Sequence, residues 1–390
     1  MIQSVFEDDT ISVRPTMVEV DLDALRDNVA AVRSLAGSAR IMATVKANAY
    51  GHGLIRTSKE LLAAGVHELG VAFLEEGIAL RRAGVTAPVL VLGGIIGNQI
   101  SHFLEYDLQI TASSVHKLQQ IDATAAAMGG RAKVHIKIDT GMGRIGVRHD
   151  NAWRLFDAAA GSAYSDVCGV FSHFASSHAA DPTFTLLQLE RFLGALEFFP
   201  THDLPMPLRH IANSGAVLQH PDALLDMVRP GIMLYGVYPD AEVRKTVPLR
   251  PVLSFKTRVV YFKAVHAGFA IGYDHTWAAP ADTRIVTLPV GYGDGYSRAL
   301  SNRGDVLVNG RRYPIAGMIS MDQCMVDIGG DAAYNGDEAV LIGRQGGEHI
   351  SVEEIAERIG TIPYEVLTMI NTRVPRKYTG GSADGGGFET

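Results

Sequence analysis

The feature that most constrains the fold is a series of short apolar runs, each followed by a segment in which apolar residues recur at helical spacing. Such runs are buried on both faces, which is typical of parallel strands in βα units. About eight units predict a TIM-type (β/α)8 barrel over residues 12–245, with its chemistry at the carboxyl ends of the strands. The predicted strands are Met42–Lys46, Leu69–Ala72, Val89–Gly93, Leu108–Ala112, Val134–Asp139, Val167–His173, Leu208–Asn213 and Met227–Leu234.

The alternation stops near Tyr238, where several prolines interrupt the chain. No long helical pattern follows until Val352–Ile359, so we expect a separate, mainly antiparallel β domain over residues 246–379. The glycine-rich residues 380–390 predict a flexible tail. The strands predicted for the β domain are Val252–Ala264, Arg284–Val290, Asp305–Val308, Arg312–Ala316, Gln323–Ile328 and Glu338–Ile342.

Composition excludes several classes of partner. The 390 residues carry a net charge of −7 without a basic stripe, which argues against nucleic acid or an anionic membrane. Two cysteines are too few for a disulfide framework, and the acidic N-terminus does not have the pattern of a signal peptide. No histidine or cysteine spacing is typical of a metal site. The sequence predicts a cytoplasmic protein without a metal.

One lysine stands where its chemistry would be altered. Lys46 ends the first predicted barrel strand, just before a turn that contains Gly51 and Gly53. Burial there would disfavour the ammonium form, lower the pKa and make the amine a nucleophile. The alternative is a lysine whose stem covers apolar neighbours while its charge reaches water. On this segment alone the two interpretations are equally weighted.

Residues 45–53, Val-Lys-Ala-Asn-Ala-Tyr-Gly-His-Gly, resemble the pyridoxal 5'-phosphate (PLP) attachment segment of alanine racemases. The resemblance extends from about Met17 to Tyr378. It implies that Lys46 carries PLP and that Tyr50 contacts the cofactor phosphate. It also implies a homodimer that interconverts L-alanine and D-alanine and supplies D-alanine for peptidoglycan, with no nucleic acid or membrane as partner.

Two further barrel segments carry the same resemblance. In Lys137–Gly146, it implies that Arg144 binds the phenolic oxygen of the cofactor and approaches the substrate carboxylate, and that Lys137 is open to carbamylation. It places His173 beside Arg144, under the cofactor ring. On the residues alone, an exposed loop arginine and a core histidine are the commoner explanations.

The loops after the seventh and eighth predicted strands match the phosphate site of many barrels. Asn213, Ser214, Gly231 and Ile232 are therefore expected to bind the cofactor, although a plain helix cap explains Ser214 equally well. The resemblance places Arg229 against the pyridine nitrogen. Because arginine only donates hydrogen bonds, that nitrogen would stay unprotonated and the ring would withdraw electrons weakly.

In the β domain, the segment around Tyr273 resembles the one that carries a catalytic tyrosine, which is expected to act from the partner subunit on the face opposite Lys46. Tyr292 matches a residue on the route to the site. Met321 and Asp322 match a pair that meets the substrate carboxylate. Thr372 replaces a tyrosine found in some members, so its contact with the phosphate stays open.

Two other functions remain as alternatives. A decarboxylase of the same architecture would need a strong electron sink, which Arg229 argues against. A non-catalytic PLP-binding barrel would have no use for the β domain. Within the racemases, serine remains an alternative to alanine as substrate.

Overall fold

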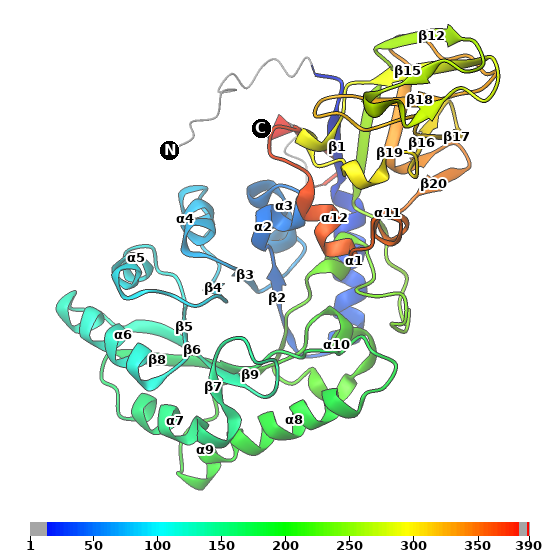
Figure 1. Cartoon of the computed structure of the whole chain (residues 1–390). Helices are drawn as coiled ribbons and strands as arrows, with labels where there is room; N and C mark the ends of the chain where they lie inside the picture. The colour runs from blue at the N-terminus through cyan, green and yellow to red at the C-terminus, as the bar shows by residue number, and fades with distance from the viewer. Residues whose placement is uncertain (1–13, 382–387, 390) are drawn as a thin grey trace. The chain divides into compact units, whose positions relative to one another are not determined.

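The computed structural model describes residues 14–381 and 388–389 (Figure 1). The chain divides into two compact units. The barrel unit comprises Arg26–Ala49 and Leu54–Leu249, and the β unit comprises residues up to Leu25, Tyr50–Gly53 and residues from Arg250 onward. Most of the predicted tail, 380–390, lies outside the described residues, as do residues 12 and 13 of the predicted barrel range.

The barrel unit contains a ring of eight parallel strands within the described chain, in the orders β10-β2-β3-β4 and β5-β6-β8-β9. A parallel bridge between Leu90 and Gln109 joins β4 to β5. Between the ends of β9 and β10, the Arg229 N–H donates to the Ala212 carbonyl at 2.8 Å. The ring is therefore closed, which confirms the predicted TIM-type barrel. The strands are β2 (Arg40–Thr44), β3 (Glu68–Val71), β4 (Val89–Val91), β5 (Ile110–Ala112), β6 (Ala132–Asp139), β8 (Ser165–Phe171), β9 (Leu208–His210) and β10 (Met227–Val228).

Helices follow most of these strands, and part of the core is an apolar cluster built from several of them. Met42, Leu90, Phe171 and Met227 come from four different strands and form one buried cluster. Burying such side chains contributes about 1.5–3 kcal/mol each. The helices are α1 (Leu22–Ala36), α3 (Leu54–Ala63), α4 (Leu74–Arg82), α5 (Ile100–Glu105), α6 (Val115–Ala127), α7 (Ala152–Ala160), α8 (Thr183–Leu196), α9 (Phe198–Thr201) and α10 (Ser214–Gln219).

Four predicted barrel strands are shorter than expected: β4 ends at Val91, β5 begins at Ile110, β9 ends at His210, and the eighth predicted strand is shortened most. The prediction ran from Met227 to Leu234, but β10 ends at Val228 and the chain forms a 3-10 turn over Ile232–Tyr235. Pro230 has no N–H to continue a ladder and Gly231 favours a turn, so the apolar run is divided between a strand and a loop.

The β unit is built around one large, mostly antiparallel sheet with the order β17-β16-β19-β11-β1-β21-β22, to which β20 adds beside β19. β1 (Met17–Asp21) lies between β11 and β21, antiparallel to the first and parallel to the second. The N-terminal strand therefore belongs to this sheet. The other members are β11 (Leu253–Arg258), β16 (Asp305–Val308), β17 (Arg311–Pro314), β19 (Glu338–Gln345), β20 (Glu348–Ile350), β21 (Arg376–Thr379) and β22 (Phe388–Glu389).

A second, three-stranded antiparallel sheet in the β unit has the order β12-β15-β18. The predicted strand Val252–Ala264 is split between the two sheets, because the chain leaves β11 at Val259 and enters β12 at Tyr261. The strands are β12 (Tyr261–Val265), β15 (Thr283–Leu288), β18 (Cys324–Asp327) and the separate pair β13 (Ala270–Ile271) and β14 (Trp277–Ala278). The helices α11 (Val352–Ile359) and α12 (Pro363–Met369) complete the unit.

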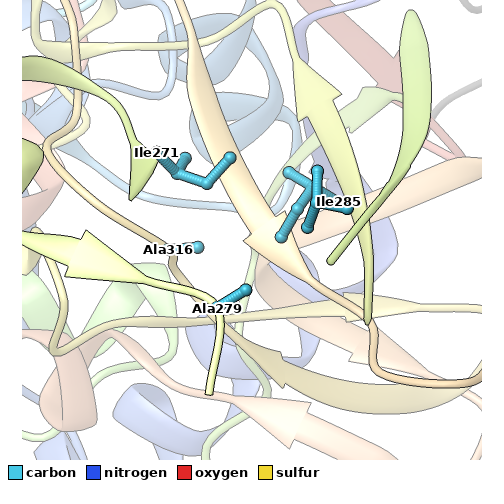
Figure 2. Close-up of a cluster of buried hydrophobic side chains, with 5 residues drawn as sticks. Ile271, Ala279, Ile285 and Ala316 are labelled. Atoms are coloured by element: carbon cyan, nitrogen blue, oxygen red, sulfur yellow. The ribbon is translucent and has the colours of Figure 1, made fainter. Parts of the chain in front are cut away.

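A small apolar core lies under the second sheet. Ile271, Ala279, Ile285 and Ala316 lie together in Figure 2, and Val265 completes the cluster. This core includes Ile271, two residues before Tyr273, so it fixes one end of the turn that carries the tyrosine.

Residues Tyr50–Gly53 are part of the β unit although both of their flanking segments belong to the barrel unit. The Arg376 guanidinium donates to the Gly51 carbonyl at 3.0 Å, and the Tyr378 hydroxyl donates to the His52 carbonyl at 2.9 Å. A Cβ on Gly51 would lie 2.3 Å from the Leu367 carbonyl oxygen, so only glycine allows this contact.

Candidate active site

Lys46 follows β2 and begins the short turn α2 (Lys46–Tyr50), which is left-handed. The φ angles of Ala47, Asn48 and Ala49 are 53°, 55° and 52°. Left-handed conformation costs a non-glycine residue about 1–2 kcal/mol, and it persists only where surrounding contacts impose it. The sequence predicted a turn here because of the following glycines, but it did not predict that alanines and an asparagine would adopt positive φ.

Glu76, on α4, holds this turn in place. One carboxylate oxygen accepts a hydrogen bond from the Ala47 N–H at 2.6 Å. The other accepts from the N–H groups of Ala72 and Phe73, at 2.8 and 3.2 Å. A single carboxylate thus joins the end of the β3–α4 loop to the residue after Lys46. Sequence reasoning missed Glu76, and the only local signal was its place in the first turn of a helix.

The surroundings of Lys46 favour the neutral amine. Burial lowers the pKa of Lys46, and the positive charge of Arg144 lowers it further, while the carboxylate of Glu76 acts in the opposite direction. A neutral amine is the nucleophilic form, so the structure supports the first of the two interpretations of this lysine.

We expect Glu76→Gln to lower the pKa of Lys46 further, because it removes the nearby negative charge that stabilises the ammonium form. The variant should also lose roughly 1–3 kcal/mol of unfolding free energy, since an amide nitrogen cannot accept from the backbone N–H groups. The pH dependence of Lys46 methylation in the cofactor-free protein, together with urea unfolding, measures both effects. Glu75→Gln, at the exposed neighbouring position, is the matched control. An unchanged Lys46 profile in Glu76→Gln would contradict the assigned role.

A buried chain of basic side chains lies at the ends of β6, β8, β9 and β10. The Arg229 guanidinium donates to the Ser172 carbonyl at 2.6 Å and to His210 Nδ1 at 2.8 Å. Because arginine can only donate, His210 Nδ1 must accept, and its Nε2–H then faces His135 Nδ1 at 2.9 Å. The chain fixes both the orientation of Arg229 and the tautomer of His210.

The basic side chains in this region are not neutralised by ion pairs with described residues. Lys137, Arg144 and Arg229 form no ion pair with a described residue, and the Lys137 ammonium nitrogen lies 4.6 Å from the centre of the Phe171 ring. Burial, then the charges of Arg229 and Arg144, lower the pKa of Lys137 well below its usual value. Burial lowers the pKa of Arg229 to about 9, which still leaves it protonated at neutral pH.

His173 lies in the same group. The pKa of its imidazole is well below the usual value. Burial lowers it most, and the positive charges of Arg229, Lys137, Arg144 and Lys46 lower it further. One Arg229 nitrogen lies 3.4 Å from His173 Nδ1. His173 is therefore a neutral, polar side chain inside a positively charged site.

Arg144 itself is exposed, on a loop shaped by Asp139. One Asp139 oxygen accepts from the N–H groups of Gly141 and Gly143, at 2.9 and 3.1 Å. The glycine φ angles of 139° and 69° permit this turn. The loop thus places Arg144 close enough to influence the pKa of both Lys46 and Lys137.

The residues predicted to bind a phosphate meet beyond β9 and β10. The Ser214 hydroxyl oxygen accepts from the Gly231 N–H at 2.9 Å, which leaves its own hydrogen available to a ligand. Asn213 acts as the helix cap, accepting from the Ala216 N–H at 3.2 Å. Ile232 is fully buried directly after Gly231.

The remaining predicted residues belong to the β unit. Tyr50 is buried, and burial, then the proximity of Tyr364, raises its pKa above the usual value. Tyr273 begins a 3-10 turn after Gly272 and is 68% exposed. Thr372 is exposed, and its hydroxyl lies 3.5 Å from the Asn371 side-chain oxygen.

Tyr292 and the Met321–Asp322 pair are neighbours. The Tyr292 N–H donates to the Ser320 carbonyl at 3.1 Å and the Gly293 N–H donates to the Met321 carbonyl at 2.9 Å. Both Tyr292 and Met321 expose their side chains. The structure therefore brings Tyr292 next to the Met321–Asp322 pair, which the sequence predicted from a separate segment.

The described residues contain no group of three or more side chains suited to a metal ion. Among the same residues, no helix combines the length and apolar character needed to span a bilayer.

Comparison with known proteins identifies the family. The model for the alanine racemase N-terminal domain matches residues 20–239, and that for the alanine racemase C-terminal domain matches residues 252–378. The chain belongs to the alanine racemase family. It is 43% identical over 370 residues to the alanine racemase of Desulforamulus reducens, covering 94% of this chain and 99% of that protein. It is also 43% identical over 376 residues to that of Symbiobacterium thermophilum, covering 96% and 100%.

Solved structures agree with this family assignment. The alanine racemase of Bacillus anthracis, solved with L-Ala-P bound, has a TM-score of 0.90 at 37% identity and covers 95% of this chain and 96% of its own. A histidine racemase from Leuconostoc mesenteroides has a TM-score of 0.88 at 27% identity, covering 96% and 100%. The predicted family and the predicted barrel followed by a mainly β domain are confirmed. The boundaries at residues 245 and 379 and the roles of the site residues stay predictions.

Proposed function

We propose that this protein is a PLP-dependent racemase that interconverts L-alanine and D-alanine. The observation that carries the proposal is Lys46, whose pKa is lowered by burial and by Arg144 in a strained turn anchored by Glu76. Family membership supports the choice of reaction, since relatives more than 40% identical over nearly the whole chain are named alanine racemases. Cytoplasmic action that supplies D-alanine for peptidoglycan is part of the same proposal.

The barrel residues fit an anionic, aromatic cofactor such as PLP. Arg144 and Arg229 supply positive charge, and neither forms an ion pair with a described residue. Lys46 would hold the cofactor covalently. The phosphate would be bound by Ser214, Asn213 and the backbone of Gly231 and Ile232, with Tyr50 as a further phenolic donor, while Arg144 and His173 would contact the ring. When bound, PLP supplies an electron-withdrawing ring that makes the substrate Cα–H acidic.

Arg229 would determine how strongly that ring withdraws electrons. Its guanidinium is held by Ser172 and His210 and stays protonated at neutral pH. A group that only donates cannot protonate the pyridine nitrogen, so electron withdrawal stays moderate. Moderate withdrawal suits a reaction in which one proton is removed from Cα and returned to the same carbon.

Two bases are needed, one on each face of the substrate. Lys46 would move the proton on one face, since burial and Arg144 lower the pKa of its amine and so favour the neutral form that can accept a proton. We assign the other face to Tyr273 of the partner subunit in a homodimer, supported by its 68% exposure. Arg144, Tyr292, Met321 and Asp322 would contact the alanine, with Arg144 near its carboxylate.

Lys137 is proposed to be carbamylated. Its buried amine has a strongly lowered pKa, so the neutral form can attack carbon dioxide and lose one proton to water. The product is an anionic carbamate. It would offset one of the two positive charges of Arg144 and Arg229 and would hold Arg144 toward the cofactor.

Purified protein should be yellow and should racemise L-alanine, followed by polarimetry with and without added PLP. Borohydride reduction and peptide mapping are expected to find a phosphopyridoxyl group on Lys46. A label on a different lysine, or none, would contradict the central assignment. Relative turnover of L-alanine, L-serine, L-histidine and L-lysine tests the substrate, and release of carbon dioxide would favour a decarboxylase.

A further inference from the structure

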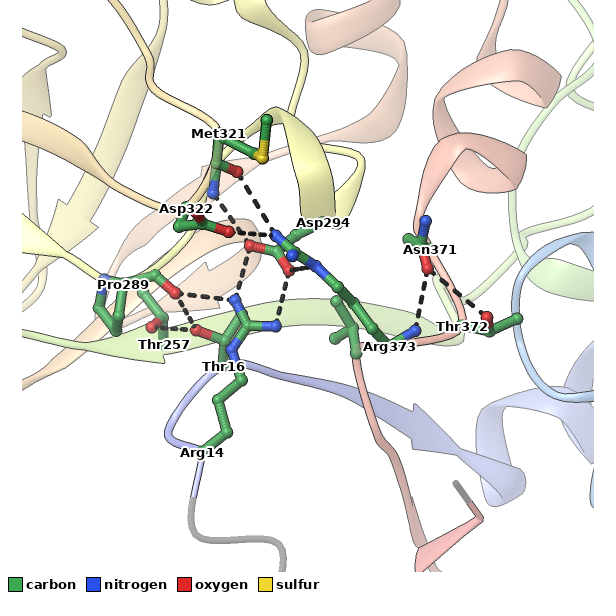
Figure 3. A network of polar contacts seen from close by, with 12 residues as sticks. Arg14, Thr16, Thr257, Pro289, Asp294, Met321, Asp322, Asn371, Thr372 and Arg373 are labelled. Atoms are coloured by element: carbon green, nitrogen blue, oxygen red, sulfur yellow. Dashed lines mark hydrogen bonds and ion pairs between the residues drawn. The ribbon is translucent and has the colours of Figure 1, made fainter. Parts of the chain in front are cut away.

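A buried carboxylate organises the part of the β unit that holds Tyr292. Asp294 ends the turn η6 (Tyr292–Asp294), and its side chain is 0% exposed. Arg14 donates to both of its oxygens at 2.6 Å, and Arg373 donates to one of them at 2.7 Å (Figure 3). The Gly291 N–H donates to the other oxygen at 3.0 Å. Burial alone would raise the pKa of Asp294, but these hydrogen bonds bring it below the usual value.

Arg373 links this buried carboxylate to the predicted substrate loop. While its Nε donates to Asp294, one terminal nitrogen donates to Asp322 Oδ1 at 2.9 Å and lies 3.4 Å from the Met321 carbonyl oxygen (Figure 3). The Asp322 side chain is 64% exposed and that of Arg373 is 33% exposed. The guanidinium therefore has one edge in the interior and the other at the surface.

The turn and the loop are fitted closely around this arginine. A Cβ on Gly293 would lie 2.5 Å from a terminal nitrogen of Arg373 and 3.0 Å from the Met321 carbonyl oxygen. A Cβ on Gly291 would lie 2.2 Å from the Ser320 carbonyl oxygen. The two glycines thus allow the Tyr292 turn to pack directly against the 320–322 loop. Arg373 contacts both segments.

The negative charge of Asp322 would oppose substrate binding if no positive group neutralised it. A free carboxylate beside Met321 would repel the carboxylate of an amino-acid substrate. The four charged side chains, Arg14, Asp294, Arg373 and Asp322, carry two positive and two negative charges, so the group is neutral as a whole. Removing Arg373 alone would leave Asp322 unbalanced at the surface.

We propose that Arg373 is a positioning residue that holds the 320–322 loop against the Tyr292 turn and neutralises Asp322, so that the loop accepts the substrate carboxylate. This inference rests on the proposed racemase function, because that function makes the loop a substrate contact. Asp294 is the fixed point from which Arg373 acts.

Arg373→Gln in the holoenzyme is expected to raise the KM for L-alanine roughly tenfold, with kcat changed less than about threefold. Binding of propionate, a carboxylate without an amine, should weaken by a similar factor in calorimetric titration. Adding Asp322→Asn should restore most of the lost affinity, because the unbalanced charge is removed. Arg358→Gln is the matched control, since Arg358 has similar exposure and pairs with Asp305 at 2.7 Å in the same unit.

The outcomes separate this inference from the proposed function. A wild-type enzyme that does not racemise alanine overturns both. An active wild type with an unchanged KM in Arg373→Gln overturns the positioning role alone, as does a raised KM that Asp322→Asn fails to lower. Should Arg373→Gln not fold, the exposed Asp322→Asn variant decides: a lower KM and tighter propionate binding are expected, and no change overturns the charge argument.

Discussion

An equimolar mixture of Lys46→Ala and Tyr273→Phe proteins, each nearly inactive alone, is expected to recover about a quarter of wild-type activity once subunits exchange. Lys46→Ala removes the amine whose pKa the barrel lowers, and Tyr273→Phe removes the exposed phenol. If each site combines Lys46 of one chain with Tyr273 of the other, half of the dimers are mixed. Each mixed dimer then has one intact site.

The reciprocal mixture provides the control. Wild type mixed with the Lys46→Ala/Tyr273→Phe double variant should fall to about a quarter of the activity of undiluted wild type, because every mixed dimer has one defect in each site. Sites within single chains would instead retain about half. Tagged chains must be shown to exchange. If they exchange and the first mixture stays inactive, the shared-site dimer is wrong, although Lys46 and Tyr273 could each still be essential.

Arg229→Glu is expected to lower kcat by roughly a hundredfold, about 2.7 kcal/mol in the barrier. A carboxylic acid at this position would offer a proton to the pyridine nitrogen of bound PLP, so the cofactor would withdraw electrons more strongly than this reaction needs. The change also removes the donors to Ser172 and His210. With L-alanine we therefore expect a long-wavelength absorption band that the wild type does not show.

Arg229→Lys is the matched variant, because it keeps a positive donor but loses the planar fork. It should show no such band. Circular dichroism and thermal unfolding of both variants would separate a folding defect from an electronic one. An unchanged spectrum and rate in Arg229→Glu would mean that Arg229 does not face the cofactor.

The barrel was predictable because most of its strands lie within apolar runs whose residues are largely buried. The predicted strand Leu69–Ala72 differs from the observed Glu68–Val71 by only one residue at each end. The sequence pattern did not predict the local structure where it is determined by proline and glycine or by contacts with residues far away in the chain. Pro230 and Gly231 divided one apolar run, and the left-handed turn after Lys46 is bonded at Ala47 to Glu76, which is 29 positions further along the chain.

The sequence predicted the candidate site only in part, for the same reason. Resemblance supplied the residue types, including Arg144, Ser214 and Arg229, but spacing could not supply the contacts among them. The hydrogen bonds that fix the tautomer of His210, one to Arg229 and one to His135, form only because the strands that carry these residues meet in the ring. The Arg373–Asp294 pair joins residues 79 positions apart, which no local pattern reveals.

The position of β1 determines how this protein could be divided by an engineer. Met17–Asp21 forms ladders on both edges, with β11 on one side and β21 on the other, and both of those strands lie beyond residue 250. A fragment that stops near residue 245 would therefore expose two unpaired strand edges and would be prone to aggregate. A soluble barrel fragment would need to omit β1, and a transplanted β unit would need that strand supplied as a separate peptide or by circular permutation.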